Sequence, residues 1–397
     1  MQLLLVAPSR SYRIGAFLAA AAELGAEVTV ATDAPAAIPG SSLCVDFDDP
    51  SGAARQLVAA AASGDPFDGV VGTDGDAMAV AAETARLVGL PTNPGTALTA
   101  AGDKRLQRRA AAAVGLPQPE FAVIGGDELP AWSIYPAVLK PLDRSASQGV
   151  IAIDASDQLR AGVATVRSIV GPSAPVLLEA FVGGTEVAVE CLLRYGRLEV
   201  LSIFDKPDTP NGPVFPETLL VSPGRLDEDV RARVVEVATA AVAAIGLIDG
   251  PVHVELKVDG DRVLFLELAA RTIGGLCSRV VRHAGMSLEE LVLRHALRLP
   301  VPVQPPAGTS GAAASGVLML PVGQSGRLRA VGGVAEARSV DGIIDVVLSV
   351  APGEEVVALP AGDRYLGFVF ARGRSAAAVE AALRAAWGCL DVAVTAW

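Results

Sequence analysis

Two glutamates in neighbouring apolar segments form the pattern with the clearest chemical potential in the sequence. Glu255 lies within Val252–Val258, Glu267 lies within Arg262–Ala269, and a short Asp259-Gly260 turn separates the two segments. Two apolar runs joined by such a turn predict a β-hairpin. Carboxylate oxygens are the ligands that Mg²⁺ prefers. The hairpin is therefore a candidate site for a hard cation and for the phosphate groups that accompany such a cation.

The length of the turn determines whether these two glutamates share a face. A three-residue loop with Gly260 in the left-handed conformation places one set of apolar residues on a single face. These are Val252, Val254, Leu256, Leu264, Leu266 and Leu268. Glu255 and Glu267 then lie together on the opposite face, which His253 and Lys257 share. A two-residue loop would bury Glu267 without a partner, which is unfavourable by several kcal/mol, so we predict the three-residue loop.

An arginine follows the hairpin and extends its chemistry. Arg271 lies shortly after Glu267, and a guanidinium group suits a transferred phosphoryl group. Taken alone, the same pattern is also compatible with a solvated hairpin face that carries ordinary surface charges.

A lysine at the end of a strand and a small polar loop lie upstream of the hairpin. Lys140 ends the apolar segment Ala137–Lys140, and the following loop reaches Gly149 before the next strand. Backbone N–H groups of such a loop can cover phosphates while the lysine supplies a point charge. Farther along, the strand Val176–Glu179 ends before a Gly183-Gly184 bend, which by itself indicates a hinge.

The elements that must position these residues begin with an alternating pattern of strands and helices. The N-terminal third contains the predicted strands and helices Gln2–Ala7, Ile14–Leu24, Glu27–Ala31, Gly69–Val71 and Ala77–Leu87. Such βαβ alternation predicts a parallel sheet covered by helices. No G-x-G-x-x-G follows the first strand, so a dinucleotide site has little support.

The rest of the chain predicts α+β structure. The expected elements are Ala137–Lys140, Val150–Ile153, Asp157–Val170, Val176–Glu179, Glu186–Arg194, Leu198–Phe204, Asp227–Ile245, Val252–Val258 and Arg262–Ala269. Short strands and a closing helix near Ala376–Trp387 follow Pro305, and the proline-rich stretch Pro300–Pro306 is a predicted linker.

Composition and charge narrow the class of protein. The chain has 397 residues, of which 51% are hydrophobic and 19% charged, as in ordinary globular proteins. The net charge of -12 disfavours a nucleic-acid partner. Neither a run of ~18 apolar residues nor a basic segment before Gln2–Ala7 is present, so we expect a cytoplasmic protein without a membrane partner. The spacing of the four cysteines, Cys44, Cys191, Cys277 and Cys389, favours neither zinc nor disulfides.

The order of these motifs resembles that of ATP-grasp enzymes, in particular the L-amino acid ligase and carnosine-synthase-like branch. The resemblance is strongest between Lys104 and Gly275. It implies an α/β and α+β fold with a Rossmann-like N-terminal domain, a two-lobed ATP-grasp fold and a small C-terminal α+β region. The implied domains are an N-terminal domain at 1–103, a small lobe with the phosphate loop at 104–182, a large lobe with the metal site at 183–305, and a region completing the large lobe at 306–397.

The resemblance also implies roles for individual residues in binding ATP. Lys104 and Lys140 resemble the two lysines that clamp the phosphates. The covering loop corresponds to Ser145, Ser147, Gln148 and Gly149. The adenine hinge corresponds to Glu179, Ala180 and Val182. Glu186 resembles the acidic residue that holds the ribose.

Further implied roles concern the metal and the substrates. Glu255 and Glu267 resemble the carboxylates that bind two Mg²⁺ ions, with Mn²⁺ as a substitute, and Arg271 resembles the arginine that stabilises an acyl phosphate. The remaining candidate substrate residues are Glu217 as partner of an ammonium group, His253 as proton acceptor, and Gly274 and Gly275 as the wall of the pocket. Surface-turn and hairpin hydrogen-bonding roles stay open for Glu217 and His253.

The implied activity is ATP-dependent ligation of a carboxylic acid to an amine, one of them an amino acid, through an acyl phosphate in a homodimeric enzyme. One departure is Ala269, which stands where most ATP-grasp enzymes have a metal-binding asparagine. This departure leaves two alternatives open. One is a carboxylase-like or nucleotide-pathway ligase, and the other is a protein that binds ATP without turnover.

Overall fold

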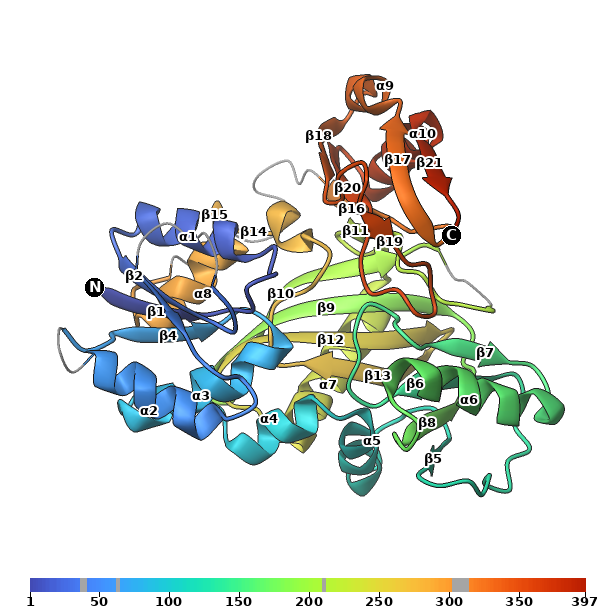
Figure 1. The fold of residues 1–397 in the computed structure, drawn as a ribbon, viewed down its shortest axis with the longest axis horizontal. Coiled ribbons are helices and arrows are strands. Elements are labelled where there is room, and N and C mark those ends of the chain that lie inside the picture. The colour runs from blue at the N-terminus through green and yellow to red at the C-terminus, as the bar shows by residue number, and fades with distance from the viewer. Residues whose placement is uncertain (36–40, 62–64, 209–211, 302–313) are drawn as a thin grey trace.

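The computed structural model describes residues 1–35, 41–61, 65–208, 212–301 and 314–397 (Figure 1). Most of the predicted linker Pro300–Pro306 therefore lies outside the described residues. Among the helices of the described ranges, none is both long enough and apolar enough to cross a bilayer.

The N-terminal unit is a parallel four-stranded sheet. Its strands β1 (Gln2–Val6), β2 (Glu27–Thr32), β3 (Ser41–Cys44) and β4 (Gly69–Gly72) lie in the order β3-β2-β1-β4. Every pair in this sheet is parallel, which confirms the predicted βαβ organisation. The strand β3 and the helix after it were not among the predicted elements.

Helices cover both faces of this sheet because successive residues of β1 point to opposite sides. Leu4 and Val6 pack in a core with residues of α2 (Pro50–Ala61) and α3 (Met78–Leu87). Leu3 and Leu5 pack on the other side with α1 (Ile14–Glu23) and α8 (Leu288–Ala296). The helix α8 comes from late in the chain, so the sheet depends on a distant segment for one of its covers.

A smaller antiparallel sheet follows in the chain and lies at the lower right of Figure 1. Its strands β5 (Phe121–Ile124), β6 (Ala137–Pro141), β7 (Ile151–Ile153) and β8 (Val176–Ala180) lie in the order β5-β8-β6-β7. The helix α6 (Leu159–Val170) packs on it through Val163 and Val166. The helices α4 (Gly95–Ala101) and α5 (Lys104–Ala113) precede this sheet.

An eight-stranded sheet forms the centre of the molecule, in the order β13-β12-β9-β10-β11-β16-β20-β18. Its strands are β9 (Thr185–Arg194), β10 (Arg197–Lys206), β11 (Leu219–Ser222), β12 (Gly250–Asp259), β13 (Arg262–Ala269), β16 (Ala314–Leu320), β18 (Ile343–Leu348) and β20 (Gly367–Gly373). The helix α7 (Glu228–Ile245) covers the face of β9 and β12, and it ends at Gly246 with a φ of 85°. A left-handed glycine is a common helix terminator.

The remaining elements are spread over different parts of the molecule (Figure 1). They are β14 (Arg282–His283), β15 (Met286–Ser287), β17 (Gly326–Gly332), α9 (Val334–Ser339), β19 (Glu355–Val356), α10 (Ala376–Cys389) and β21 (Asp391–Thr395), with 3-10 turns at Gly75–Ala77, Ser156–Gln158 and Cys277–Val280. The predicted closing helix is α10, but the chain continues into β21, which pairs with β17.

The hairpin of β12 and β13 differs from the prediction in its loop. Asp259 pairs with Arg262, so the loop has two residues, and Gly260 has a φ of 57°. A β-bulge then inserts Leu266 between the pairs Leu256–Phe265 and Glu255–Glu267. The bulge shifts the alternation by one residue. Glu267 therefore faces away from the core despite the short loop.

The bulge also corrects the predicted apolar face of β13. Val263, Phe265 and Leu268 pack in the core with Val252, Val254 and Leu256. Leu266 is half-buried and lines a cavity on the other side, so its predicted place on the core face was wrong. Leu264 is buried, but it pairs with Lys257 and therefore lies on the face opposite to the predicted one. The expectation failed because it considered only loop length as the determinant of register.

We predict that the two glycines between β8 and β9 differ sharply in their tolerance of a side chain. Gly184 has a φ of 89°, and a Cβ there would collide with the carbonyl oxygen of Val258. Nothing lies within 4 Å of a Cβ at Gly183. Gly184→Ala should reduce the free energy of unfolding by roughly 2–3 kcal/mol, while Gly183→Ala should stay close to wild type. Urea denaturation of both variants checks this, and equal stabilities would contradict it.

Candidate active site

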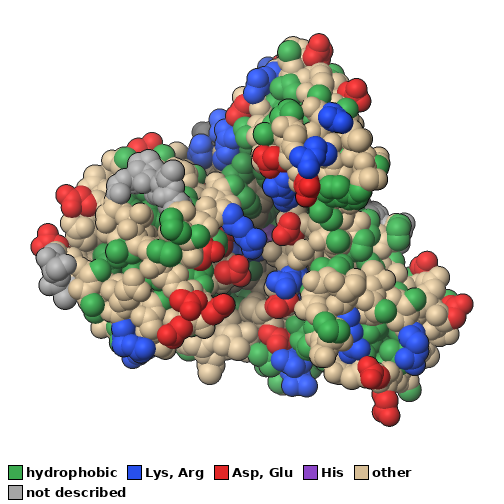
Figure 2. All heavy atoms as spheres, in the orientation of Figure 1, with side chains coloured by type: hydrophobic (Ala, Val, Ile, Leu, Met, Phe, Trp, Pro, Cys, Tyr) green, Lys and Arg blue, Asp and Glu red, His purple; other side chains and the backbone are tan. Residues whose placement is uncertain are grey.

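A cavity of about 950 Å³ lies where the N-terminal unit, the two sheets and the C-terminal segment meet. Figure 2 shows the molecular surface hollowed between these parts, with acidic and basic side chains gathered around the hollow. Every site residue named from the sequence except Gly149 lines this cavity. The structure therefore brings together residues that lie far apart in the chain.

A buried ion-pair network holds Lys140 in place at the cavity wall. Its Nζ atom lies 2.6 Å from Oε2 of Glu179, whose other oxygen accepts a hydrogen bond from Arg108. Burial by itself would raise the pKa of Glu179, but the charges of Arg108 and Lys140 lower it to about 2. Glu179 is therefore ionised at neutral pH and orients the lysine.

Arg108 also contacts the bulged strand β13. Its guanidinium donates hydrogen bonds to the carbonyl oxygens of Phe265, at 3.2 Å, and Leu266. The neighbouring Gln107 exchanges two hydrogen bonds with the backbone of Leu268, both at 2.9 Å. Because β13 is the edge of its sheet, these side chains satisfy backbone groups that would otherwise lack partners.

Arg108 was missed in the sequence because its partners lie elsewhere in the chain. A usable signal was present, since Lys104 and Arg108 are four residues apart and share one face of α5. Lys104 donates to the carbonyl oxygen of Arg144 at 2.7 Å, and its Nζ atom lies 3.3 Å from Oε2 of Glu267. This face of α5 thus connects the predicted phosphate loop with the hairpin.

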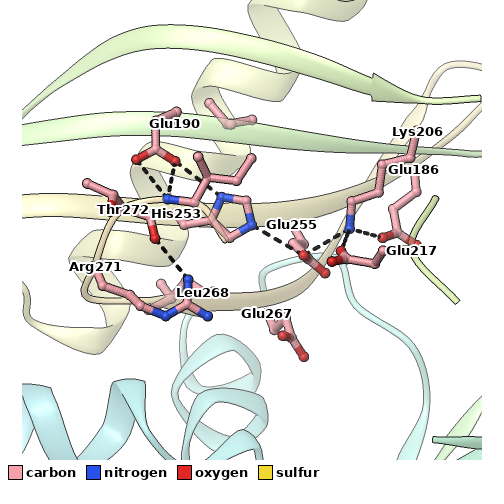
Figure 3. Close-up of polar contacts among 12 residues, drawn as sticks. Glu186, Glu190, Lys206, Glu217, His253, Glu255, Glu267, Leu268, Arg271 and Thr272 are labelled. Carbon is pink, nitrogen blue, oxygen red and sulfur yellow. Dashed lines mark hydrogen bonds and ion pairs between the residues drawn. The ribbon is translucent and has the colours of Figure 1, made fainter. Parts of the chain in front are cut away.

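A buried lysine gathers three of the predicted carboxylates (Figure 3). Lys206 Nζ lies 2.6 Å from Glu186, 2.6 Å from Glu217 and 2.9 Å from Glu255. Burial opposes the charge of Lys206, but the three carboxylates raise its pKa well above the ordinary value. Glu186 also lies 3.6 Å from Lys257. No role was predicted for Lys206 from the sequence, although it stands at the end of an apolar strand, as Lys140 does.

The carboxylates on this side of the cavity have the chemistry of a Mg²⁺ site. Oxygens of Glu186, Glu217 and Glu255 all lie within 4.8 Å of one another. Glu267 pairs with Glu255 across the hairpin and points to the same cavity. Carboxylate oxygens suit Mg²⁺ and Mn²⁺, whereas Ala269 contributes no side-chain ligand. The residues present therefore fit a divalent cation.

His253 lies between two glutamates. Its Nδ1 atom is 3.3 Å from Glu190 and its Nε2 atom is 3.2 Å from Glu255. Burial alone would lower the pKa of His253, but hydrogen bonds to the two carboxylates raise it to about 9. Glu190 also accepts two contacts from the backbone N–H of Ile273, at 3.1 and 3.0 Å. The protonated ring is thus a hydrogen-bond donor at neutral pH.

The predicted phosphate loop contacts the C-terminal segment. The N–H of Gly149 donates to Pro360 at 2.7 Å, and the side-chain amide of Gln148 donates to Ala361 at 2.9 Å. Ser147 has a φ of 57°, which is unfavourable for a residue with a side chain. Ser145, Ser147 and Gln148 line the cavity, while Gly149 packs beneath, where a Cβ would lie 2.6 Å from Pro141.

The segment after the hairpin packs against the N-terminal unit. Arg271 donates to the carbonyl oxygen of Thr272 at 2.9 Å, and the N–H of Gly275 donates to the Tyr12 hydroxyl at 3.0 Å. A Cβ at Gly275 would collide with Met319, whereas one at Gly274 would make ordinary contacts. Both glycines line the cavity, but close packing requires the absence of a side chain only at Gly275.

Three family models match successive parts of the chain. The ATP-grasp N-terminal domain matches residues 18–92, the ATP-grasp domain matches residues 133–280, and L-amino acid ligase C-terminal domain 2 matches residues 318–395. The order of these matches follows the order of the structural units described above.

Solved structures share the fold over the whole chain. The crystal structure of L-amino acid ligase from Bacillus licheniformis is 26% identical, with 99% of this chain and 98% of that chain covered and a TM-score of 0.85. N5-carboxyaminoimidazole ribonucleotide synthetase from Thermotoga maritima is 18% identical, with 100% of each chain covered and a TM-score of 0.73. At that identity, the second likeness shows the fold alone.

A curated relative is the vancomycin/teicoplanin A-type resistance protein VanA of Enterococcus faecium. It is 26% identical over an alignment of 215 positions, which covers 48% of this chain and 60% of that protein. The chain spans 60% and 61% of the length of the curated relatives that it matches.

We predict that His253 gives the protein a stability that depends on pH. The pKa of about 9 in the folded protein lies above the ordinary 6.5, so the stabilisation is complete below pH 6.5 and is lost as the pH rises through about 9. His253→Gln keeps a polar side chain but does not titrate. Urea denaturation between pH 6 and 10 should show a wild-type decrease larger than that of the variant by on the order of 1–3 kcal/mol. Parallel curves for the two proteins would refute a protonated His253.

Proposed function

We propose that this ATP-grasp protein, similar to L-amino acid ligases over its whole length, is an ATP-dependent ligase that joins a carboxylic acid to an amine, with an amino acid as one of the two. The observation that carries the proposal is the arrangement of charge in one cavity. Lys104 and Lys140 approach from α5 and the small sheet, while Glu255 and Glu267 approach from the hairpin. Lysines suit phosphate groups, and carboxylates suit the cation that accompanies them.

ATP would occupy the part of the cavity between the two sheets. Lys140 and Lys104 would bind its phosphates, and the N–H groups of the loop Ser145–Gly149 would cover them. Ala180 and Val182 line the cavity beside β8 and are the candidate neighbours of adenine. Glu186 is the candidate partner of the ribose hydroxyls. Support for this placement comes from Glu179, which fixes Lys140 from behind.

Glu255 and Glu267 are the proposed metal-binding residues, with Mg²⁺ as the expected ion and Mn²⁺ as a substitute. When bound, such an ion would neutralise phosphate charge. The protein itself prepares the site, because Lys206 and His253 lower the pKa of Glu255 well below its ordinary value despite the opposing effect of burial. Glu255 is therefore ionised in advance.

The proposed reaction has two steps. A carboxylate oxygen attacks the γ-phosphorus of ATP, the new O–P bond replaces the bond to ADP, and an acyl phosphate results. The amine nitrogen then attacks the acyl carbon, the C–N bond forms, inorganic phosphate leaves and the surplus proton of the amine passes to water. Arg271 would stabilise the charge on the transferred group, and Glu217 would hold an ammonium group of the substrate.

Two other activities remain as outcomes of the test. A carboxylase-like or nucleotide-pathway ligase would use bicarbonate or formate as the acid, and the N5-carboxyaminoimidazole ribonucleotide synthetase from Thermotoga maritima shares the fold. A protein that binds ATP without turnover is the second alternative, because Ala269 offers no side-chain ligand.

We predict that ADP formation requires an acid and an amine together. The assay measures ADP and phosphate from ATP and Mg²⁺ across a matrix of carboxylic acids and amines that includes the amino acids. Glu267→Ala should lower the paired-substrate rate at least about 100-fold, because it removes a proposed metal ligand. Glu236→Ala is the matched control, since Glu236 is exposed on α7, away from the cavity.

The pattern of stimulation distinguishes the alternatives. ADP formation that needs bicarbonate or formate, rather than an acid and amine pair, would favour the carboxylase-like or nucleotide-pathway ligase. ATP binding without ADP formation for any pair would favour the non-catalytic protein. An unchanged rate in Glu267→Ala would remove the proposed metal role of the hairpin.

A further inference from the structure

Arg13 is a buried arginine that the N-terminal unit places in the cavity wall. It lies directly before α1, and only 7% of its surface is exposed. Its Nη1 atom donates to the carbonyl oxygens of Thr73, at 2.9 Å, and Thr272, at 3.1 Å. The first partner belongs to the N-terminal unit and the second follows the hairpin, so Arg13 joins the two.

A second guanidinium meets Arg13 at the same acceptor. Arg271 donates to the carbonyl oxygen of Thr272 at 2.9 Å, and this oxygen is therefore shared by two cations. Burial lowers the pKa of Arg271 from its ordinary value, and the charge of Arg13 lowers it further. Two like charges beside one neutral oxygen repel each other in a region that is only partly hydrated.

The surrounding residues compensate the charge of Arg13 better than that of Arg271. Burial opposes the charge of Arg13, but Tyr12 and Asp74 raise its pKa above the ordinary value. An oxygen of Asp74 lies 3.6 Å from Nε of Arg13, and hydrogen bonds from Ser11 and Thr73 engage the same carboxylate. Within the described ranges, no carboxylate lies within 4.0 Å of the Arg271 guanidinium. The buried Nε atom of Arg13 has no hydrogen-bond partner. That atom faces Asp74, so an anion in the cavity would interact with the guanidinium groups of Arg13 and Arg271 through their charge rather than through this atom.

The neighbouring wall of the cavity is apolar. The Tyr12 ring lies 6.2 Å from that of Phe368, and the Tyr365 ring lies 6.0 Å from Phe368. Met319 lines the same cavity. An anion joined to an organic group fits this combination of a cationic corner and an aromatic wall better than a free inorganic ion does.

We propose that Arg13 and Arg271 together bind the carboxylate of the acid substrate, so that the N-terminal unit supplies half of the acid site. Two guanidinium groups can each donate to a carboxylate. The group attached to that carboxylate would lie against Tyr12 and Phe368. The identity of the anion, as the carboxylate of the acid substrate, rests on the proposed ligase function. The existence of an anion site does not depend on that function.

The first test measures steady-state kinetics with the acid and amine identified in the matrix assay. Arg13→Gln removes the charge and should raise KM for the acid by about 10- to 100-fold, while KM for ATP changes by less than about twofold. Arg13→Lys keeps the charge, so its KM for the acid should lie between that of the wild type and that of Arg13→Gln. Arg86→Gln, an exposed arginine on α3 that pairs with Glu83, is the control. Equal changes in both KM values would indicate that Arg13 only holds Thr73 and Thr272 together, and would overturn the proposal.

The second test needs no turnover and uses acetate and inorganic phosphate as probes. Thermal denaturation should show stabilisation of the wild type by either anion relative to equal chloride, and a loss of about tenfold or more in apparent affinity in Arg13→Gln and Arg271→Gln. Asp74→Asn removes the competing carboxylate and should strengthen the response by about 2- to 10-fold. If Arg13 only held Thr73 and Thr272 together, Asp74→Asn would not increase the apparent affinity for either anion.

The outcomes separate this inference from the proposed function. No stabilisation of the wild type, or an unchanged response in Arg13→Gln, would overturn the anion site. If Arg13→Gln does not fold, the Arg13→Lys and Asp74→Asn responses decide, and wild-type affinity in both would overturn the proposal. Anion binding that depends on Arg13 in a protein without ligase activity would retain the site and reject the ligase.

Discussion

One buried guanidinium, that of Arg108, connects the parts of the protein on which the cavity depends. It contacts Glu179 on β8 and the carbonyl oxygens of Phe265 and Leu266 on β13. Only 1% of Arg108 is exposed, so its charge must be balanced by these partners. Because Glu179 in turn binds Lys140, the position of a cavity lysine on the small sheet is tied to the backbone of the large one.

The hydrogen bonds of Arg108 also stabilise the β-bulge at Leu266, which determines the direction of Glu267. A bulge leaves carbonyl groups on an edge strand without a ladder partner, and Arg108 supplies donors at that place. The bulge then directs Glu267 toward the cavity and away from the core, opposite Glu255. The direction of the hairpin carboxylates and the packing of α5 against β8 and β13 thus depend on one another.

The cations that line the cavity differ in how many carboxylate partners they have. Lys206 has three carboxylates around it, and His253 has two. Both cations thus have carboxylate partners. Burial raises the pKa of Glu190 and Glu217 despite these cations, whereas Lys206 and His253 lower the pKa of Glu255 well below its ordinary value. Arg13 and Arg271 share a carbonyl oxygen instead. The carboxylates around Lys206 suit a metal ion, which would take over part of the role of the lysine. The guanidinium of Arg271, which has no carboxylate partner within the described ranges, suits an anion.

The sequence by itself determined the local elements and the residue types of the site. The alternation of strands and helices in the N-terminal third predicted the parallel sheet, and the predicted helix Asp227–Ile245 ends where α7 ends. Both depend on neighbours along the chain. The order of Lys104, Lys140, Glu255 and Glu267 predicted the resemblance to ATP-grasp enzymes, and ATP-grasp family models match parts of the chain. Only the tertiary structure decided which charges meet. Arg108 and Glu179 are 71 residues apart, Gln107 and Leu268 are 161 apart, and Arg13 and Thr272 are 259 apart. Loop length alone predicted the wrong hairpin register, because the bulge at Leu266 is stabilised by donors from α5, and no periodicity within the hairpin encodes them.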